Sequence, residues 1–280
     1  MRRWLLALAV LASTVALPAP AHAAAPGWIT SCQYSHENHD DPIVFPNQPG
    51  AAHLHTYVGA TTTDADSTPG SLRAGGTTCL MPDDTSAYWV PAMYVGNQQI
   101  LPTGTGKHAL FYYRRKGAPP GVTVRTIPDG LKMVIGNAHA QSPADNPQLG
   151  SDIIFKCGPG SGIDLDHPPA QCSSSGVLSV SIRFPNCWDG ERLDSPNHRS
   201  HMAYPVGSSC PATHPVVLPR LESFFRYDVG NLPLGNDLHW SSGPWYTVHQ
   251  DFLNAWVPSG LQHFVTTCIN AMKDCGKNPT

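Results

Sequence analysis

Charge, glutamate and long apolar runs are all scarce in this sequence. Only 13% of its 280 residues are charged, and Glu37, Glu191 and Glu222 are the only glutamates. No run of more than three like charges occurs, so the footprint of a sequence-independent nucleic-acid binder is missing. Beyond the first two dozen residues no run of about 18 apolar residues occurs, so we expect no membrane-spanning helix. We therefore predict neither a nucleic acid nor a membrane as partner.

Two common chemical signatures are also absent. No G-x-S-x-G motif occurs, because Gly70-Ser71 and Gly160-Ser161 lack the second glycine at the required position, and this excludes a serine hydrolase with a nucleophile elbow. No C-x-x-C pair occurs either. Zinc held by thiolates is therefore not expected.

The N-terminus has the composition of a secretory signal peptide. Arg2 and Arg3 precede an apolar run over residues 4–17 and the small-residue triplet Ala21-His22-Ala23. This order predicts a signal peptide over residues 1–23 and cleavage before Ala24. Removing its two arginines leaves 15 basic and 20 acidic residues, so the net charge of −3 becomes −5. We predict a secreted, extracellular and monomeric protein.

All eight cysteines lie after the predicted signal peptide. An oxidising compartment favours four disulfides, and pairing in sequential order closes the smallest loops. The predicted bonds are Cys32–Cys79, Cys157–Cys172, Cys187–Cys210 and Cys268–Cys275.

Short runs of β-branched and aromatic residues recur between clusters of glycine and proline. We predict strands at Tyr88–Val95, Lys107–Arg114, Leu131–Ile135, Asp152–Cys157, Val177–Phe184, Phe224–Tyr227 and Trp245–Val248. In Val177–Phe184 apolar and polar residues alternate, as in a strand with one buried face. Helical spacing after Pro258 predicts a helix that Gly276 ends. Residues 60–78 and 138–150 are expected to be long loops, a type of segment that is often functional.

These elements favour a mainly β fold. We expect residues 24–280 to form a single disulfide-stapled domain, a β-sandwich or jelly-roll-like structure with long loops and one C-terminal helix.

Histidines occur together with acids or amides in three places. His53 and His55 point to one face if their segment is extended, a spacing suited to two metal ligands. Trp188 and Asp189 begin a loop that the predicted Cys187–Cys210 bond would anchor. His249 and Asp251 share a face of any strand that contains them, so the carboxylate would orient the imidazole.

Three long blocks contain these clusters: DDPIVFPNQPGAAHLHTYVG, FPNCWDGERLDSPNHRSHMAYP and VHQDFLNAW. They resemble the signature blocks of the secreted bacterial and fungal family catalogued as domain of unknown function 1996. This chain departs from the family pattern at Gln250 and Ala255, which spares His249 and Asp251. The family has no assigned activity, and the wall- and sugar-binding modules attached to its relatives imply a carbohydrate setting. The motif positions carried over are His53, His55, Trp188, Asp189, Asp194, His201, His249 and Asp251.

We therefore expect a secreted enzyme, a hydrolase or lyase, that acts on an extracellular polysaccharide or cell-wall glycan. The predicted catalytic residues are His55, Asp189, His201, His249 and Asp251, and the predicted substrate-binding residues are Trp188, Asp194, Arg199 and Trp256. One divalent metal ion is a possible cofactor, with His53 and His55 as ligands and a third ligand from His201, His249 or Asp251. The alternative is a non-catalytic wall-binding or metal-holding module in which Trp188, Trp245 and Trp256 form a stacking platform.

Overall fold

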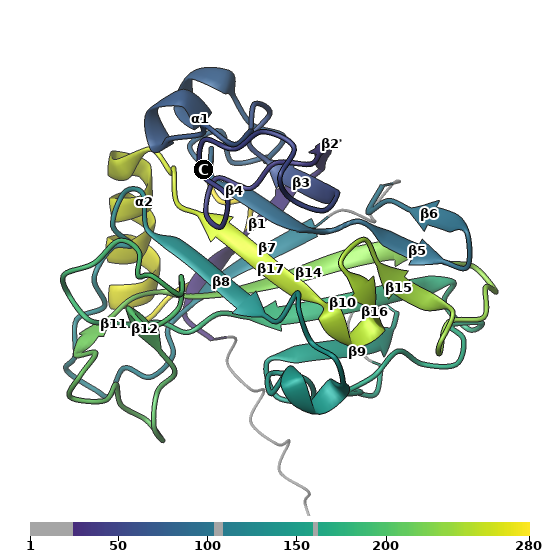
Figure 1. Cartoon of the computed structure of the whole chain (residues 1–280). Helices are drawn as coiled ribbons and strands as arrows, with labels where there is room; N and C mark the ends of the chain where they lie inside the picture. The colour runs from purple at the N-terminus through teal and green to yellow at the C-terminus, as the bar shows by residue number, and fades with distance from the viewer. Residues whose placement is uncertain (1–24, 104–108, 159–161) are drawn as a thin grey trace, which may run out of the picture.

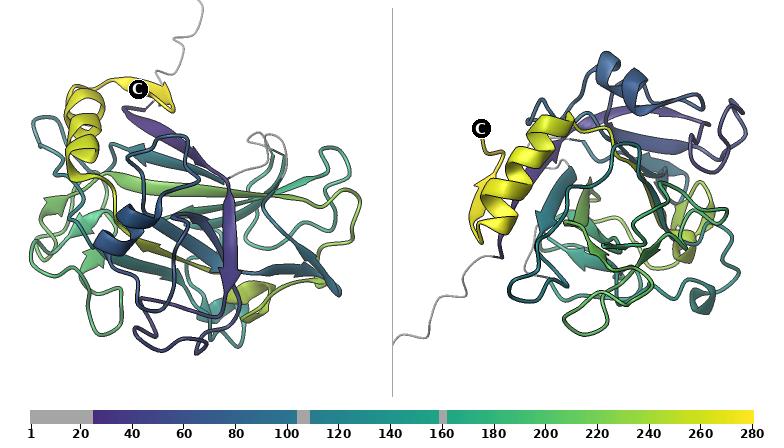
Figure 2. Two further views of the ribbon diagram at one scale, coloured as in Figure 1. Left: turned by 90° about the horizontal axis from the view of Figure 1, so that it is seen from above. Right: turned by 90° about the vertical axis from the view of Figure 1, so that its left-hand side faces the viewer.

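Two large sheets pack face to face and make the protein a β-sandwich (Figure 1, Figure 2). The computed structural model describes residues 25–103, 109–158 and 162–280, so the predicted signal peptide lies outside the described residues. One sheet has six strands, in the order β18 (Asp274–Lys277), β1 (Gly27–Cys32), β7 (Ala109–Arg114), β14 (Arg220–Asp228), β10 (Val177–Arg183) and β9 (Ile153–Cys157). The other has five, in the order β2 (Tyr34–Asn38), β3 (His55–Gly59), β4 (Ala87–Pro91), β17 (His249–Leu253) and β8 (Lys132–Gly136). The expected mainly β fold is confirmed.

Smaller elements surround the sandwich. A three-stranded sheet joins β12 (Met202–Ala203), β11 (Cys187–Trp188) and β13 (Val216–Val217), and a four-stranded sheet joins β16 (Gly243–Pro244), β15 (Leu238–Trp240), β5 (Met93–Val95) and β6 (Gln98–Ile100). The helical segments are α1 (Pro69–Gly75), η1 (Pro143–Asp145), η2 (Trp245–Thr247), α2 (Pro258–Phe264) and η3 (Val265–Asn270). Two of these, α1 and η1, interrupt the segments that were expected to be loops.

The main core lies between the two large sheets. The ring of Tyr88 on β4 stacks on Phe111 on β7 with 3.7 Å between centroids, and Phe252 on β17 lies beside Tyr88. A second, smaller apolar cluster covers the opposite face of the five-stranded sheet; it contains Ile43, Tyr57, Ala60, Leu72, Ala87, Trp89, Leu253 and Ala255. The five-stranded sheet is therefore buried on both faces, and side chains on its outer face are shielded from water.

All four predicted disulfides are present: Cys32–Cys79, Cys157–Cys172, Cys187–Cys210 and Cys268–Cys275. No cysteine is free. Within the described residues, no helix is both long enough and apolar enough to span a membrane.

The predicted strand Trp245–Val248 is wrong. Residues Trp245–Thr247 form the short 3-10 helix η2, and the strand begins at His249. The side-chain amide of Asn146 donates to the carbonyls of Tyr246 and Val248, at 2.9 Å each. These carbonyls are therefore satisfied by a side chain from a distant loop and need no sheet partner.

The predicted helix also ends earlier than Gly276. Its α-helical part is followed by π-type turns that stop at Asn270. Met272 has a φ of 57° and is 63% exposed, so it does not continue the apolar stripe. The chain reverses here because β18 returns to pair with β1 in parallel.

Strand β10 is buried on both faces, not on one. Its polar residues Ser179 and Ser181 are fully buried. The small serines lie between longer neighbours, since Ser179 pairs with Lys156 and Arg226 and Ser181 with Ile154 and Phe224. The alternation of residue types is present, but the longer side chains on the two neighbouring strands cover the small serines.

Candidate functional site

Strand β17 divides its residues between the core and the candidate site. Gln250 and Phe252 point inward, where the Ser223 hydroxyl donates to the side-chain Oε1 of Gln250 and Phe252 lies beside Tyr88. Because side chains alternate along a strand, His249 and Asp251 point to the outer face. Both are nearly inaccessible, at 4% and 1% exposure.

Strand β3 brings His55 to the same outer face. In the sheet register His55 pairs with Pro91 on β4, and Asp251 pairs with Trp89 on β4. His55 and His249 therefore lie in one row of side chains with only proline between them. His53 precedes the strand, and its ring approaches both of the others, so the two histidines of the H-x-H motif meet although only one is in a strand.

Gly136 on β8 makes room for His249. It pairs with His249 in the register and has a φ of 88°, a conformation that favours glycine. A methyl group in its place would lie 2.3 Å from the Val248 carbonyl oxygen and 2.6 Å from the His249 Cα. A larger residue would displace the backbone that carries the histidine.

The three imidazoles form a compact cluster. The Nε2 atoms of His53 and His249 are 3.1 Å apart, and one ring nitrogen from each of His53, His55 and His249 lies within 4.8 Å of the others. His55 Nδ1 donates to the Asp40 carbonyl at 3.0 Å, and His249 Nδ1 donates to the Thr247 carbonyl at 2.9 Å. Both Nε2 atoms are therefore unprotonated in the neutral rings, the tautomer that a metal-binding histidine requires.

Burial keeps these imidazoles neutral. Desolvation, aided by His139 and His39, lowers the pKa of His53 to about 4. Desolvation and the neighbouring His53 lower the pKa of His249 to about 3 and hold that of His55 well below its usual range. All three are unprotonated at neutral pH and available as ligands.

Two buried carboxyl groups complete the cluster. Neither oxygen of Asp251 has a hydrogen-bond partner among the described residues, nor does His55 Nε2. Desolvation and the nearby Asp41 raise the pKa of Asp251 well above its usual value. Asp41 accepts from the amides of Ile43 and Val44 at 2.8 and 2.9 Å, and burial raises its pKa as well. Ligand atoms of Asp41, His55 and Asp251 also lie within 4.8 Å of one another.

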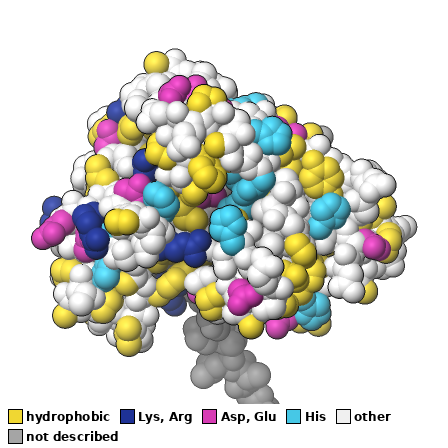
Figure 3. All heavy atoms as spheres, in the orientation of Figure 1, with side chains coloured by type: hydrophobic (Ala, Val, Ile, Leu, Met, Phe, Trp, Pro, Cys, Tyr) yellow, Lys and Arg dark blue, Asp and Glu magenta, His cyan; other side chains and the backbone are white. Residues whose placement is uncertain are grey.

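A pocket of about 170 Å³ opens over this cluster. It is lined by Asp41, Val44, Phe45 and His53 from the first block, Asn197, His198 and Arg199 from the second, His249 and Asp251 from the third, and Val134, Asn137, Ala138 and His139 from β8 and the loop after it. Histidine and basic side chains gather in the middle of this face of the molecule (Figure 3). All three sequence blocks therefore contribute to one pocket.

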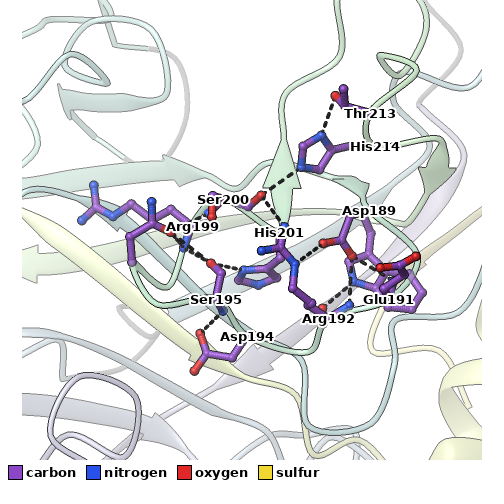
Figure 4. A network of polar contacts seen from close by, with 12 residues as sticks. Asp189, Glu191, Arg192, Asp194, Ser195, Arg199, Ser200, His201, Thr213 and His214 are labelled. Atoms are coloured by element: carbon purple, nitrogen blue, oxygen red, sulfur yellow. Dashed lines mark hydrogen bonds and ion pairs between the residues drawn. The ribbon is translucent and has the colours of Figure 1, made fainter.

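Asp189 and His201 lie outside this pocket, although both were predicted to be catalytic. The Asp189 carboxylate accepts from the backbone amides of Glu191 and Arg192 and forms an ion pair with the Arg192 side chain at 2.7 Å (Figure 4). The buried ring of His201 contacts the Ser195 hydroxyl and donates to the Lys132 carbonyl at 2.7 Å. Both side chains are occupied in fixing the loop between Cys187 and Cys210.

Three of the four predicted substrate-binding residues are also occupied elsewhere. Trp256 is 1% exposed and donates to the Tyr113 hydroxyl in the core, which removes it from any sugar-stacking surface. The half-buried Trp188 donates to the Arg192 carbonyl. Asp194 pairs with His198 at 2.9 Å and thereby orients a pocket residue. Only Arg199 lines the pocket itself.

Sequence reasoning missed several pocket residues. Asp41 follows Asp40 in a D-D-P turn. Apart from its position in the first block, nothing in the sequence indicated that its carboxylate would line a pocket. Asn137 and His139 belong to a segment outside the three blocks. The long-loop prediction for residues 138–150 covered His139 only. His198 lies in the second block three residues before His201, and nothing in the local sequence shows which of the two histidines lines the pocket.

A family model described as "Domain of unknown function (DUF1996)" matches residues 41–256, so the chain belongs to that family. No curated protein and no solved structure matches the chain.

Proposed function

We propose that this member of the DUF1996 family is a secreted, metal-dependent enzyme, a hydrolase or lyase, that cleaves an extracellular polysaccharide in this pocket. One observation carries the proposal: the buried Asp251 carboxyl and His55 Nε2 lack partners beside two further imidazoles. Buried polar atoms normally have partners, and leaving them without any is costly. A divalent cation would satisfy all of these atoms at once.

The donor set suits a transition metal of the zinc class. Imidazole nitrogen is a preferred ligand of zinc, copper, iron and nickel, whereas calcium prefers oxygen alone. Two nitrogen ligands of a tetrahedral zinc ion, each at about 2.0–2.1 Å, lie roughly 3.3 Å apart. The 3.1 Å between the Nε2 atoms of His53 and His249 is close to this spacing. The carbonyls that hold His55 and His249 are the outer partners typical of ligating histidines.

The pocket residues then have distinct roles. His53, His55 and His249 would hold the ion, and Asp251, whose Oδ2 is 3.9 Å from His249 Nε2, would be either a fourth ligand or a proton acceptor. The bound ion supplies Lewis acidity and lowers the pKa of a bound water to about 7. Arg199 and His198 lie at the pocket wall, where a substrate would be bound.

The alternatives receive less support. Hydrolysis by a pair of carboxylates would have used Asp189 or Asp194 with Asp251, and the first two are engaged in the neighbouring loop. A stacking platform of three tryptophans loses Trp256 to the core. Perturbed acids and imidazoles at the base of a pocket are typical of catalytic sites and are not needed by a shallow binding surface.

The setting of the enzyme is part of the proposal. Four disulfides fit an oxidising compartment, and the N-terminal pattern predicts export. The polysaccharide substrate rests on the carbohydrate setting that the family resemblance implies.

The test uses the full chain secreted from an oxidising host. Its metal content is measured, the metal is removed with a chelator, and zinc, copper, manganese or calcium is added back. Release of reducing ends or unsaturated uronates is followed on a panel of wall polysaccharides. We expect activity that a transition metal restores and calcium does not. A protein that binds no transition metal and cleaves no polymer would contradict the proposal.

A further inference from the structure

The pocket continues past Arg199 into a second depression. This second pocket, of about 90 Å³, is lined by Met133, Val134, Ile135, Gln148, Pro185, His198, Arg199, Met202 and Tyr204. It shares Val134, His198 and Arg199 with the first pocket. Val134, His198 and Arg199 therefore border both depressions, which adjoin each other over β8 and are together called the groove. Two adjoining depressions can accept successive residues of a linear polymer.

Arg199 is attracted by the charge of Asp251 but forms no ion pair with it. Its backbone amide is held by the Ser195 hydroxyl at 3.1 Å and the Asn197 side-chain oxygen at 3.2 Å. Its guanidinium forms no hydrogen bond or ion pair with any described residue, and in Figure 4 the side chain extends away from the polar network of its loop. By contrast Arg192, on the same loop, forms an ion pair with Asp189 at 2.7 Å.

The charges of the groove leave Arg199 unbalanced. Asp41 and Asp251 are the only acidic residues that line the two pockets. With neutral imidazoles, these two carboxylates balance one divalent cation in the proposed centre. Asp251 attracts the Arg199 guanidinium, but if its carboxylate balances the cation, no acid that lines the two pockets is left to balance Arg199, while the chain as a whole carries a net negative charge. Attraction for an anion is therefore a local property of the groove.

We infer that the substrate of this site is an anionic polysaccharide, and that Arg199 binds its carboxylate or sulfate groups. The inference rests on the proposed function and names its substrate class. A planar guanidinium suits this task because it donates two parallel hydrogen bonds to a carboxylate or sulfate. The exposed His139 offers a further donor along the wall of the groove.

The test measures binding of four polymers to the metal-loaded full chain by calorimetry. Polygalacturonate is compared with its carboxyl-reduced neutral form, and dextran sulfate with dextran, so the two pairs separate carboxylate from sulfate recognition. We expect at least one charged polymer to bind about tenfold more tightly than its neutral partner, with affinity that falls as salt rises. The Arg199→Gln variant should lose this preference, and Arg199→Lys should retain part of it.

The matched control is Arg125→Gln, because Arg125 is exposed and lines neither pocket. Its preference for charged polymers should equal that of the wild type. Equal binding of charged and neutral polymers, or an unchanged preference in Arg199→Gln, would overturn the inference. Zinc titration separates the two proposals, because Arg199 is not a metal ligand. If Arg199→Gln binds zinc normally but has lost the preference for charged polymers, both proposals are supported. If the wild type binds no zinc, only the metal centre is refuted.

Discussion

The Nε2 atoms of His53 and His249 lie 3.1 Å apart, although 196 positions separate the two residues in the chain. His249 lies on β17 and His53 in the segment that leads into β3. Such proximity between two imidazole nitrogens requires a proton or a cation between them, and the unprotonated His249 Nε2 can accept either.

Replacing either of these two histidines should abolish tight metal binding. We expect His249→Ala and His53→Ala to weaken zinc affinity by at least about 100-fold, more than the loss of an outer-shell partner causes. Competition with a chromophoric chelator measures the change. His263→Ala is the control, because His263 is exposed on α2 and lines neither pocket. Equal zinc affinity in His249→Ala and the wild type would contradict the three-histidine centre.

Asp251→Asn should change stability in opposite directions with and without metal. In the presence of chelator the variant should melt at a higher temperature, because it removes a buried carboxyl group that has no partner. With saturating zinc it should melt at a lower temperature than the wild type, because a metal that binds only the folded state stabilises it. Scanning calorimetry measures both. The exposed Asp66→Asn variant should melt at the same temperature as the wild type in both conditions. If the melting temperature of Asp251→Asn changed in the same direction with chelator and with zinc, a contact between Asp251 and the metal would be ruled out.

Asp84 should make stability depend on pH in a defined window. Burial raises its pKa from 3.8 to about 7, against the hydrogen bond from Tyr88. Because the pKa is raised in the folded state, the stability associated with the protonated carboxyl is present below pH 3.8 and is lost as pH rises through 7.

The variant Asp84→Asn should therefore become more stable relative to the wild type between pH 4 and pH 7, by roughly 4 kcal/mol at most, and the difference should then level off. Urea unfolding at several pH values measures it. The exposed Asp237→Asn variant should show no such trend. A pH-independent difference for Asp84→Asn would mean that this carboxyl titrates normally.

Gly136→Ala should damage both the fold and the site. The new methyl group would approach the Val248 carbonyl oxygen to 2.3 Å at a φ of 88°. We expect the free energy of unfolding to fall by about 3 kcal/mol or more, and zinc affinity to fall with it because His249 must move. Gly121→Ala is the matched control, since Gly121 has a φ of 85° and nothing within 4 Å of the added atom.

That control should lose only about 1–2 kcal/mol, the contribution of the left-handed backbone alone. Its zinc affinity should equal that of the wild type. Equal losses of stability and metal affinity in the two variants would show that the contact at Gly136 does not position the histidine.

The sequence was most informative where one local rule decides the outcome. Loop closure selected the four disulfides, and the period of two along a strand placed His249 and Asp251 on one face. It was least informative where a distant side chain intervenes. Asn146 supplies the hydrogen bonds that make residues 245–247 a turn, and no local pattern announces such a partner.

The choice among similar residues was likewise beyond local rules. Asp189 and Asp251 are both acids inside signature blocks, yet one is satisfied by the amides of its own turn and the other by no protein group. Only the three-dimensional neighbourhood distinguishes them, because the same residue type serves a turn in one place and a pocket in another.

Alternate residues of strand β17 face the core and the pocket, and this limits which insertions and deletions the chain can accept. Deleting one residue before His249 would turn Gln250 and Phe252 toward the pocket and the histidine and aspartate toward Tyr88, since a shift of one position exchanges the two faces of a strand. Substitutions on one face can accumulate independently of the other, but insertions and deletions cannot. Length changes in this family should therefore be confined to the loops that flank β17, and the strand itself should keep a constant length.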